Sequence, residues 1–384
     1  MKQRTVPCVV YRGGTSRGVF FNEADLPTSS IARNHIFMSA IDAYNPSQVN
    51  GLGSGTSHTS KVITVRPSER ADACLSYTFH QVGIGEAIVD AEGTCGNLMA
   101  AVGAYAIDEG YVECPTENGI VDVTVYNENI GRLIELTVPV ESGRALVEGD
   151  YLMPGLVHSG ARIGVSILSP GGGKTGKTFP IGRKCNLTVD GQQVEATFSD
   201  VVNPFVFVHA EAFGYTGFES NAVLGADTEL LGLLETIRIA GAVASGMADS
   251  PEMAREVPSI PKVALVSAPC DYVATSGETI RADEVDIIAR MISMGKFHWT
   301  FAGSGLYNLA SMTLLEETVP HDCVRKYGVE NDKRTRKMVR IGHPDGVAEV
   351  MVELTPDGSD VVAVGLDRTA RRIMDGQCYV PDWM

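Results

Sequence analysis

The stretch EGTCGNLMAAVGAYAIDEG, residues 92–110, has the apolar spacing of a helix and ends in a glycine typical of a C-cap. It places Cys95 at the start of that helix, where the free backbone N–H groups of Gly96, Asn97 and Leu98 point towards it. Such a position stabilises a thiolate and can also receive a carboxylate. A small buried cysteine at a helix cap is the ordinary alternative, but the neighbouring glycines let a ligand approach the backbone.

A second part of the chain echoes the first. The helical segment GSGLYNLASMTLL, residues 303–315, resembles the first helix, and the strand segment TSKVITV, residues 59–65, is echoed by IPKVALV, residues 260–266. In each half a lysine at the start of a strand precedes a small-residue turn that opens a helix. This weak internal similarity predicts two copies of one fold unit, which would meet at a cleft where binding sites usually lie.

Composition and charge narrow the class of protein. The chain has 384 residues, 44% of them hydrophobic, which is ample for one or two cores. Its formal net charge of −16 repels phosphate backbones, so we expect no nucleic-acid partner. No window approaches 18 apolar residues and the N-terminus does not resemble a signal peptide, so we expect no membrane span and a cytoplasmic location. The eight cysteines are scattered without a C-x-x-C pair, which predicts reduced thiols and argues against a zinc knuckle or a redox pair.

The order of expected elements divides the chain into two lobes. Short strands dominate, and the pattern restarts near residue 188. We therefore predict an N-terminal lobe over 1–187 and a C-terminal lobe over 188–369, with 370–384 packing back on the first. Helices are expected over ADEVDIIARMISMG, residues 282–295, and, as a short one, over LDRTARRIMDG, residues 366–376.

The segment GGGKTGKT, Gly171–Thr178, matches the phosphate-binding pattern G-x-x-x-x-G-K-[ST] at every position. A functional loop of this type needs a helix that opens at the lysine. Pro180 and Gly182 follow within the first turn and break a helix, and the chain then alternates like a strand. We expect a flexible surface hairpin. A nucleotide-binding or non-catalytic accessory protein remains the alternative, which saturable ATP binding lost in Lys177→Ala would support.

The segment GLGSGTSHTSKVITV, residues 51–65, leads Lys61 from a polar loop into an apolar strand. A lysine that enters a buried strand loses solvation, which favours the neutral amine and makes it a usable base. The ordinary alternative is a lysine whose ammonium reaches the surface at the strand end. His58, on the loop, is an alternative base.

Three further segments carry groups that suit a carboxylate. YRGGTSRG, residues 11–18, combines glycine amides with Thr15, Ser16 and Arg17, although a simple glycine hairpin is equally expected. Residues 294–305 and 366–376 add further cations, hydroxyls and a second helix start. These are Lys296, His298, Gly303, Ser304, Arg368, Arg371 and Arg372, of which the arginines could equally form a solvated face.

Together, RGGTSRG, TSKVITV, GTCGNLMAAVGAYAI, FGYTG, ETIRIAGA, MGKFH and RTARRIMDG resemble the PrpF family over residues 11–376. That family includes 2-methylaconitate cis-trans isomerase, 3-methylitaconate Δ-isomerase, 4-oxalomesaconate tautomerase and aconitate isomerases. The resemblance implies an α+β fold like that of diaminopimelate epimerase, with two pseudo-symmetric lobes. Each lobe would be a β-barrel-like sheet wrapped around a central helix, with the active site in the cleft. The central helices would begin at Cys95–Gly96 and Gly303–Ser304.

The resemblance also implies a function. It predicts an isomerase of unsaturated di- or tricarboxylic acids, with catalytic residues Lys61 and Cys95, no metal and no organic cofactor. Separately from the resemblance, we expect a homodimer. Arg17 stands where the family usually has lysine. A rival hypothesis is an amino-acid epimerase of the same fold, which would carry cysteine where this chain has Ser304. The residues expected to bind substrate are Thr15, Ser16, Arg17, Ser60, Gly96, Asn97, Asn203, Lys296, His298, Gly303 and Ser304.

Overall fold

The computed structural model describes residues 3–381 except for 92, 115–117, 154, 259, 294 and 325–335, and at 293 and 336 it describes the backbone alone. The chain forms two compact units, the first from Met1–Leu168 with Leu366–Met384 and the second from Ser169–Gly365. The sequence analysis placed these boundaries at 187/188 and 369/370. The structure assigns residues 169–187 to the second unit and residues 366–369 to the first.

The first unit is built on a mixed sheet with the strand order β21-β1-β2-β3-β4-β6-β7-β9. The pairs β2–β3 and β4–β6 are parallel, and the other neighbours are antiparallel. Short strands β5 and β8 pair with β4 and β7. The strands are β1 Gln3–Gly13, β2 Ser16–Asn22, β3 Lys61–Pro67, β4 Leu75–Val82, β5 Val89–Asp90, β6 Gly119–Asn127, β7 Arg132–Glu141, β8 Arg144–Ala145, β9 Ile163–Leu168 and β21 Ala370–Pro381.

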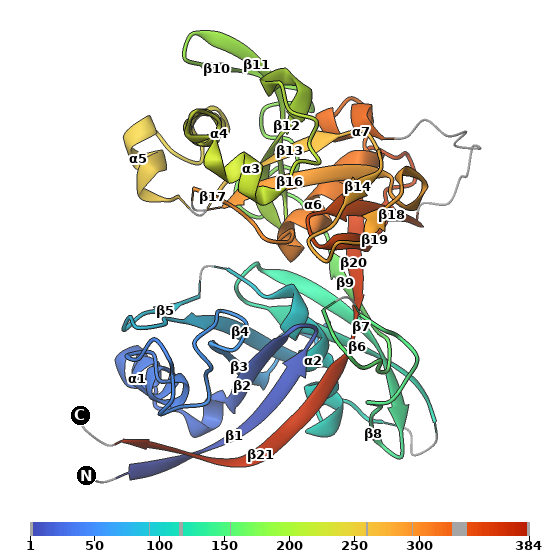
Figure 1. Ribbon diagram of the computed structural model, residues 1–384. Helices are drawn as coiled ribbons and strands as arrows, with labels where there is room; N and C mark the ends of the chain where they lie inside the picture. The colour runs from blue at the N-terminus through green and yellow to red at the C-terminus, as the bar shows by residue number, and fades with distance from the viewer. Residues whose placement is uncertain are drawn as a thin grey trace. The chain divides into compact units, whose positions relative to one another are not determined.

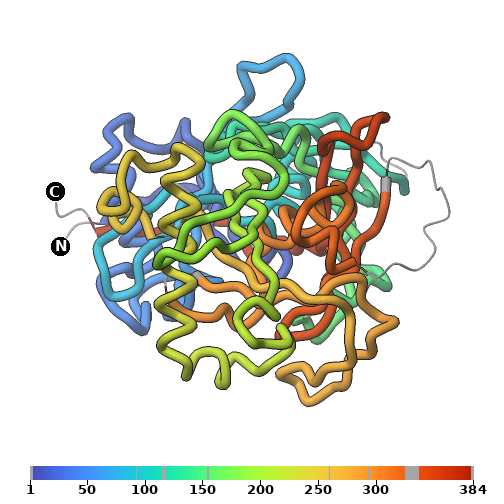
Figure 2. The backbone as a smooth tube through the Cα atoms, turned by 90° about the horizontal axis from the view of Figure 1, so that it is seen from above, coloured from blue at the N-terminus to red at the C-terminus, as the bar shows by residue number. Residues whose placement is uncertain are grey.

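The C-terminal strand closes the first unit. β21 lies antiparallel to β1 along its whole length, from Gln3 opposite Pro381 to Gly13 opposite Ala370 (Figure 1). Figure 2 shows the beginning and end of the chain side by side, as this register requires. The last strand therefore completes the sheet that the first strand begins.

Two helices cover opposite faces of this sheet. Helix α1, Ser30–Ile41, packs its apolar side on Val19, Phe21 and Val62. Helix α2, Gly96–Asp108, is buried from Leu98 to Ile107 and contacts strands on several sides, as an all-apolar helix must. A one-turn 3-10 helix, η1 Glu23–Asp25, leads from β2 towards α1.

The second unit repeats the arrangement. Its sheet has the order β10-β11-β12-β13-β16-β18-β19-β20, and the parallel pairs are β12–β13 and β16–β18. Short strand β17 pairs with β16, and β14 and β15 form a separate hairpin. The strands are β10 Cys185–Val189, β11 Gln192–Val201, β12 Asn203–His209, β13 Lys262–Ser267, β14 Tyr272–Val273, β15 Thr279–Ile280, β16 Ile287–Ser293, β17 Lys296–Phe297, β18 Arg336–His343, β19 Gly346–Leu354 and β20 Val361–Arg368.

In the second unit, too, one long helix packs on one face of the sheet and another is buried among the strands. Helix α4 packs Leu230, Leu234 and Ile237 on β10–β13, while α6 is buried from Gly305 to Thr313 and contacts β11, β12, β18 and β19. The helical segments are η2 Ala210–Phe213, α3 Asn221–Ala226, α4 Thr228–Ala244, α5 Pro251–Glu256, η3 Ala282–Glu284, α6 Gly303–Leu314 and α7 Val319–Cys323.

The two units share one topology. Along each strand order the seven neighbouring pairs alternate identically: antiparallel, antiparallel, parallel, antiparallel, parallel, antiparallel, antiparallel. Lys61 begins β3 and Lys262 begins β13. Each of these strands is the fourth in its order and lies parallel to the third. Each unit also holds a helix that is buried along most of its length, α2 in the first and α6 in the second. The echoed sequence segments thus occupy equivalent places.

Two expected helices are wrong. Residues 282–295 contain η3 followed by strand β16, and residues 366–376 belong to β20 and β21. β16 lies between β13 and β18 and is buried on both faces, so its apolar run has no alternation that distinguishes a strand from a buried helix. In the second case pairing with β1 overrides the local pattern. Among the described residues, no helix is long and apolar enough to cross a membrane.

Acid should destabilise the second unit through His343 on β18. Burial lowers the pKa of His343 from 6.5 to about 4, because its charged form is poorly solvated there. The unfolded chain therefore binds more protons than the folded chain between these values, so stability falls as pH falls from 6.5 towards 4. We expect a loss on the order of a few kcal/mol. Urea unfolding at several pH values between 4 and 6.5 measures this loss. In His343→Gln the free energy of unfolding should depend less steeply on pH. If the pH dependence were the same as in the wild type, burial of His343 would not be its cause.

Candidate functional site

The turn between β1 and β2 packs directly on the first turn of α2. A Cβ on Gly13 would lie 2.5 Å from the Asn97 backbone oxygen. Gly14 has a φ of +49°, and a Cβ there would lie 2.4 Å from Asn97 Oδ1. Both positions require glycine, so the GG pair brings the following Thr15 and Ser16 against the start of the helix.

Asn97 connects three segments at this helix start. Its Nδ2 donates to Thr15 Oγ1 at 3.0 Å and to Ser16 Oγ at 3.4 Å, while its Oδ1 accepts from Arg368 Nε at 2.9 Å. The Asn97 amide therefore orients two hydroxyls and one guanidinium at the same place. These are residues that the sequence predicted for carboxylate binding, but their mutual bonds depend on tertiary structure.

Cys95 is the N-cap residue of α2, and it forms no side-chain cap hydrogen bond there. Its Sγ lies 3.8 Å from Ser16 Oγ, and Ser16 is buried. The first-turn amides of Gly96 and Asn97 thus have no capping side chain, which leaves them able to donate to an anion. Buried Asn127 donates from Nδ2 to Thr94 Oγ1 at 2.7 Å, which holds the residue that precedes Cys95 in place.

Lys61 is the first residue of β3 and is only 8% exposed. Its Nζ donates to Gln81 Oε1 at 2.8 Å and lies 4.9 Å from the centre of the Phe79 ring. Gln81 Nε2 in turn donates to the Ser60 carbonyl at 2.7 Å, which fixes the amide. The lysine is thus held by a neutral group, and no carboxylate of the described residues pairs with it.

Strand geometry puts Lys61 and Ser16 at the same end of the first unit. β2 and β3 are parallel neighbours, and they begin at Ser16 and Lys61. Val62 faces α1, so Lys61 faces the opposite side, where Gly18 contacts Leu98 of α2. The structure therefore brings Lys61, Ser16 and Cys95 to one region around the start of α2.

Three other predicted residues of this region hold the polar loop. Arg17 donates from its backbone N to the His58 carbonyl at 2.9 Å and from its guanidinium to the Leu52 carbonyl at 2.8 Å. Ser60 is fully buried, and its hydroxyl lies 2.8 Å from Gln48 Oε1 and 2.7 Å from the Thr56 carbonyl oxygen, the two acceptors for its single proton. His58 is exposed. Arg17 and Ser60 thus have structural partners that the sequence did not reveal.

The arginines of residues 366–376 lie on strands and diverge. Arg368 reaches Asn97, as described above. Arg371 is exposed, and Arg372 forms ion pairs with Glu109 at 2.8 Å and Asp375 at 2.9 Å. Of these three arginines only Arg368, the last residue of β20, joins the groups around Asn97, whereas Arg371 and Arg372 lie on β21, which pairs with β1.

The remaining predicted residues belong to the second unit. Gly303 and Ser304 form the first turn of α6, whose N-cap, Ala302, forms no side-chain cap hydrogen bond. Lys296 is exposed on β17, and the His298 carbonyl accepts from Asn221 Nδ2. Asn203 begins β12, and its carbonyl accepts from buried Asn308 Nδ2 at 2.9 Å.

The loop Gly171–Thr178 does not have the surroundings of a nucleotide site. The expectation that no helix follows it is confirmed, since the next regular element is β10. The amides of Lys174 and Thr175 donate to Asp200 Oδ2 at 2.7 Å, and Thr178 Oγ1 donates to Asp360. The amides that would bind a phosphate are therefore occupied by a buried carboxylate of the protein itself.

Removing this carboxylate should destabilise the second unit. Asp200→Ala leaves two amides without their acceptor and is expected to lower the free energy of unfolding by on the order of 2 kcal/mol. Lys177→Ala, on an exposed side chain of the same loop, should change it by less than about 0.5 kcal/mol. Chemical denaturation compares the two variants. Saturable ATP binding by the wild type that is lost in Lys177→Ala would contradict our interpretation of the loop.

One group of described residues has ligand atoms spaced for a metal ion: Glu195, His209 and Asp322. The Lys184 ammonium forms an ion pair with Asp322 and lies 3.5 Å from Glu195. Because a lysine already neutralises these carboxylates, we assign the cluster no functional role.

Sequence reasoning missed Gln81, the partner of Lys61. Its position, opposite Lys61 in the β3–β4 ladder, follows from the antiparallel register. The segment YTFHQV alternates as a strand should, yet no sequence pattern specifies which of its residues faces a lysine on another strand.

Comparison with known proteins identifies the chain. The family model described as PrpF protein matches residues 3–381. The chain is 37% identical to the 3-methylitaconate isomerase of Eubacterium barkeri, over 98% of each chain. It is 33% identical to the 2-methyl-aconitate isomerase of Shewanella oneidensis, over 99% of this chain and 98% of that one.

A solved structure agrees with these matches. The crystal structure of a methylitaconate-delta-isomerase superposes with a TM-score of 0.89 at 35% identity, covering 100% of this chain and 99% of that one. The mixed fold expected from the resemblance is therefore that of a methylitaconate isomerase. This protein belongs to the PrpF family and is an isomerase.

Proposed function

We propose that this isomerase acts on a small unsaturated di- or tricarboxylic acid and shifts a proton along its allylic system with Lys61. The named relatives act on 3-methylitaconate and 2-methylaconitate, which supports this substrate class. The observation that carries the proposal is the environment of Lys61. Lys61 is buried and its Nζ donates to the neutral Gln81 amide. The strand that it begins, β3, is the parallel neighbour of β2, whose first residue, Ser16, lies against the uncapped start of α2.

The proposed reaction balances without another reactant. The Lys61 amine removes a proton from the carbon next to the double bond and becomes an ammonium, and the electron pair moves into a dienolate. The double bond re-forms at the neighbouring position as a proton is added at the far carbon. Return to the original carbon after rotation would instead interconvert cis and trans forms. Cys95, or a water that it orders, is proposed to deliver this second proton, after which the Lys61 ammonium returns its proton to the thiolate or hydroxide that is left; where Cys95 only shields that face, Lys61 itself delivers its proton to the far carbon.

The charge that forms in the dienolate must be stabilised where it develops. We propose that the first-turn amides of α2 at Gly96 and Asn97 donate to a substrate carboxylate, with the hydroxyls of Thr15 and Ser16. Arg368 adds positive charge, since its Nε binds Asn97 and its other nitrogens keep donor capacity. Lys61 and Arg368 would thus supply local positive charge in a protein whose formal net charge is −16.

Proton NMR of the purified protein in D₂O tests the proposal. The candidate substrates are trans-aconitate, cis-aconitate, 2-methylaconitate, 3-methylitaconate and oxalomesaconate. We expect deuterium at an allylic carbon, or a new isomer, with at least one of them. No exchange with any acid, but exchange at the α-carbon of an amino acid, would instead establish the epimerase hypothesis.

A further inference from the structure

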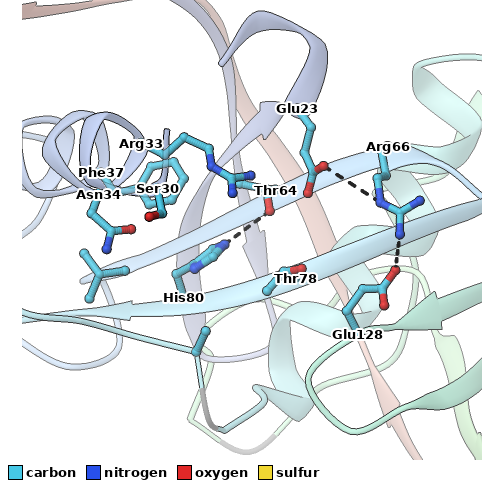
Figure 3. Close-up of a pocket in the computed structure, with 12 residues that line it drawn as sticks. Glu23, Ser30, Arg33, Asn34, Phe37, Thr64, Arg66, Thr78, His80 and Glu128 are labelled. Atoms are coloured by element: carbon cyan, nitrogen blue, oxygen red, sulfur yellow. Dashed lines mark hydrogen bonds and ion pairs between the residues drawn. The ribbon is translucent and has the colours of Figure 1, made fainter. Parts of the chain in front are cut away.

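A pocket of about 470 Å³ lies on the face of β3 and β4 opposite Lys61. It is enclosed by one side of α1, by the outer residues of the two strands, and by β5 (Figure 3). The side chains from α1 are Ser30, Arg33, Asn34 and Phe37, which lie on one helical face by their spacing. This volume is typical of small-molecule sites, which run from about 300 to 1,000 Å³.

One end of the pocket is positive. The Arg33 guanidinium forms no hydrogen bond or ion pair with any side chain that the structure describes, so its donors are free for a ligand. Beneath it, Thr64 Oγ1 and His80 Nε2 lie 3.2 Å apart, and the His80 ring packs 4.9 Å from Phe37 (Figure 3). Burial, together with Arg33, lowers the pKa of His80 to about 4. The histidine is therefore neutral at pH 7, and Arg33 is the positively charged group at this end of the pocket.

The other end is negative. Arg66 lies between Glu128, 2.5 Å from its Nη2, and Glu23, 3.8 Å from its Nε. These two carboxylates line the pocket, and a third, the exposed Glu69 outside it, lies 3.8 Å from Arg66 Nη1. Carboxylates therefore outnumber the guanidinium here, and each can accept further hydrogen bonds. In Figure 3, Arg66 lies farther along β3 than Thr64, with Glu23 and Glu128 on either side of its guanidinium.

We propose that this pocket is a second ligand site, which binds a small zwitterion with the chemistry of a free amino acid. The ligand carboxylate would pair with Arg33, and its ammonium would face Glu23. An acid with two or three negative charges is disfavoured because Glu23 and Glu128 would repel it. The site therefore differs in charge from the one proposed for the substrate.

A ligand in the pocket should change the position of the Lys61 side chain, because β3 and β4 carry residues of both sites on their two faces. Thr64 pairs with Thr78 in the register, and His80 precedes Gln81, the residue that holds Lys61. A ligand that shifts His80 would therefore move the Gln81 amide on the opposite face. This coupling, unlike the binding itself, rests on the proposed function.

Calorimetric titration of the full chain tests the binding. The probes are glycine, L-alanine, β-alanine and L-serine, with acetate as an anion without the ammonium. We expect at least one amino acid to bind saturably, with a Kd raised about 10-fold or more in Arg33→Gln. Lys61→Met and Arg70→Gln should bind as the wild type does, since Arg70 is outside the pocket and pairs with Asp72.

A second variant tests the ammonium end independently. Glu23→Gln should weaken amino-acid binding and leave acetate unaffected. Binding that is lost in Lys61→Met but kept in Arg33→Gln would place the ligand at the catalytic lysine and overturn the proposal. Failure of every amino acid to bind at millimolar concentration would overturn it too. The coupling is then measured as a change in isomerase rate with the bound amino acid, and an unchanged rate refutes that step alone.

Discussion

Lys61→Met should lower kcat by on the order of 10²–10⁴-fold, the range that a positioned acid or base contributes. The substitution removes the amine while keeping an unbranched chain of similar length beside the Phe79 ring, where a thioether packs well. The folded structure should persist, because the position is nearly buried and methionine requires no hydrogen bond. Deuterium incorporation by NMR, with the substrate that the wild type turns over, gives the rate.

A matched lysine variant separates the chemistry from general effects of charge. Lys177 is exposed on the second unit, so Lys177→Met should retain the wild-type rate. Circular dichroism should show that both variants are folded. If Lys61→Met exchanged deuterium as fast as the wild type, another group would be the base, and Cys95 would be the next to replace.

Gly13→Ala should impair both stability and turnover. Its Cβ would lie 2.5 Å from the Asn97 backbone oxygen and 3.0 Å from Leu98 Cα, and neither backbone atom can move without shifting the start of α2. Overpacking of this kind costs about 1–3 kcal/mol. A displacement of about 1 Å at reacting groups can cost on the order of 10²-fold in rate. Thermal unfolding and the NMR assay measure the two effects.

The control is a glycine with open space. Gly119 begins β6, and nothing lies within 4 Å of a Cβ added there. Gly119→Ala should therefore leave both rate and melting temperature close to the wild type. If Gly13→Ala behaved like this control, the turn would not position Thr15 and Ser16 against the helix start.

Much of the proposed site was predictable because its residues stand in short contiguous motifs. Cys95 and Asn97 open one helix, and Thr15 and Ser16 follow a glycine pair, so local chemistry suffices to propose them. Arg17 and Ser60 are also predicted to bind substrate, and their side chains bond to the polar loop, which the sequence did not reveal. Motif membership does not specify the direction of a side chain.

The errors in secondary structure have the same physical origin. Residues 287–293 are apolar at nearly every position because β16 is covered on both faces, so the helical prediction had nothing local to contradict it. Residues 370–381 became a strand because β1 offers them a partner from the other end of the chain.

The sequence by itself determined the two buried helices, the lysine at the start of each matching strand, and the loop after Thr178 that cannot form a helix. Each of these depends on residues that are close in the chain. Tertiary structure alone decided that Gln81 accepts from Lys61 and that Asn97 bonds to both Ser16 and Arg368. It also decided that the Asp200 carboxylate accepts from backbone amides of the loop Gly171–Thr178. These contacts join residues far apart in sequence, and strand register and packing, which no local pattern encodes, bring them together.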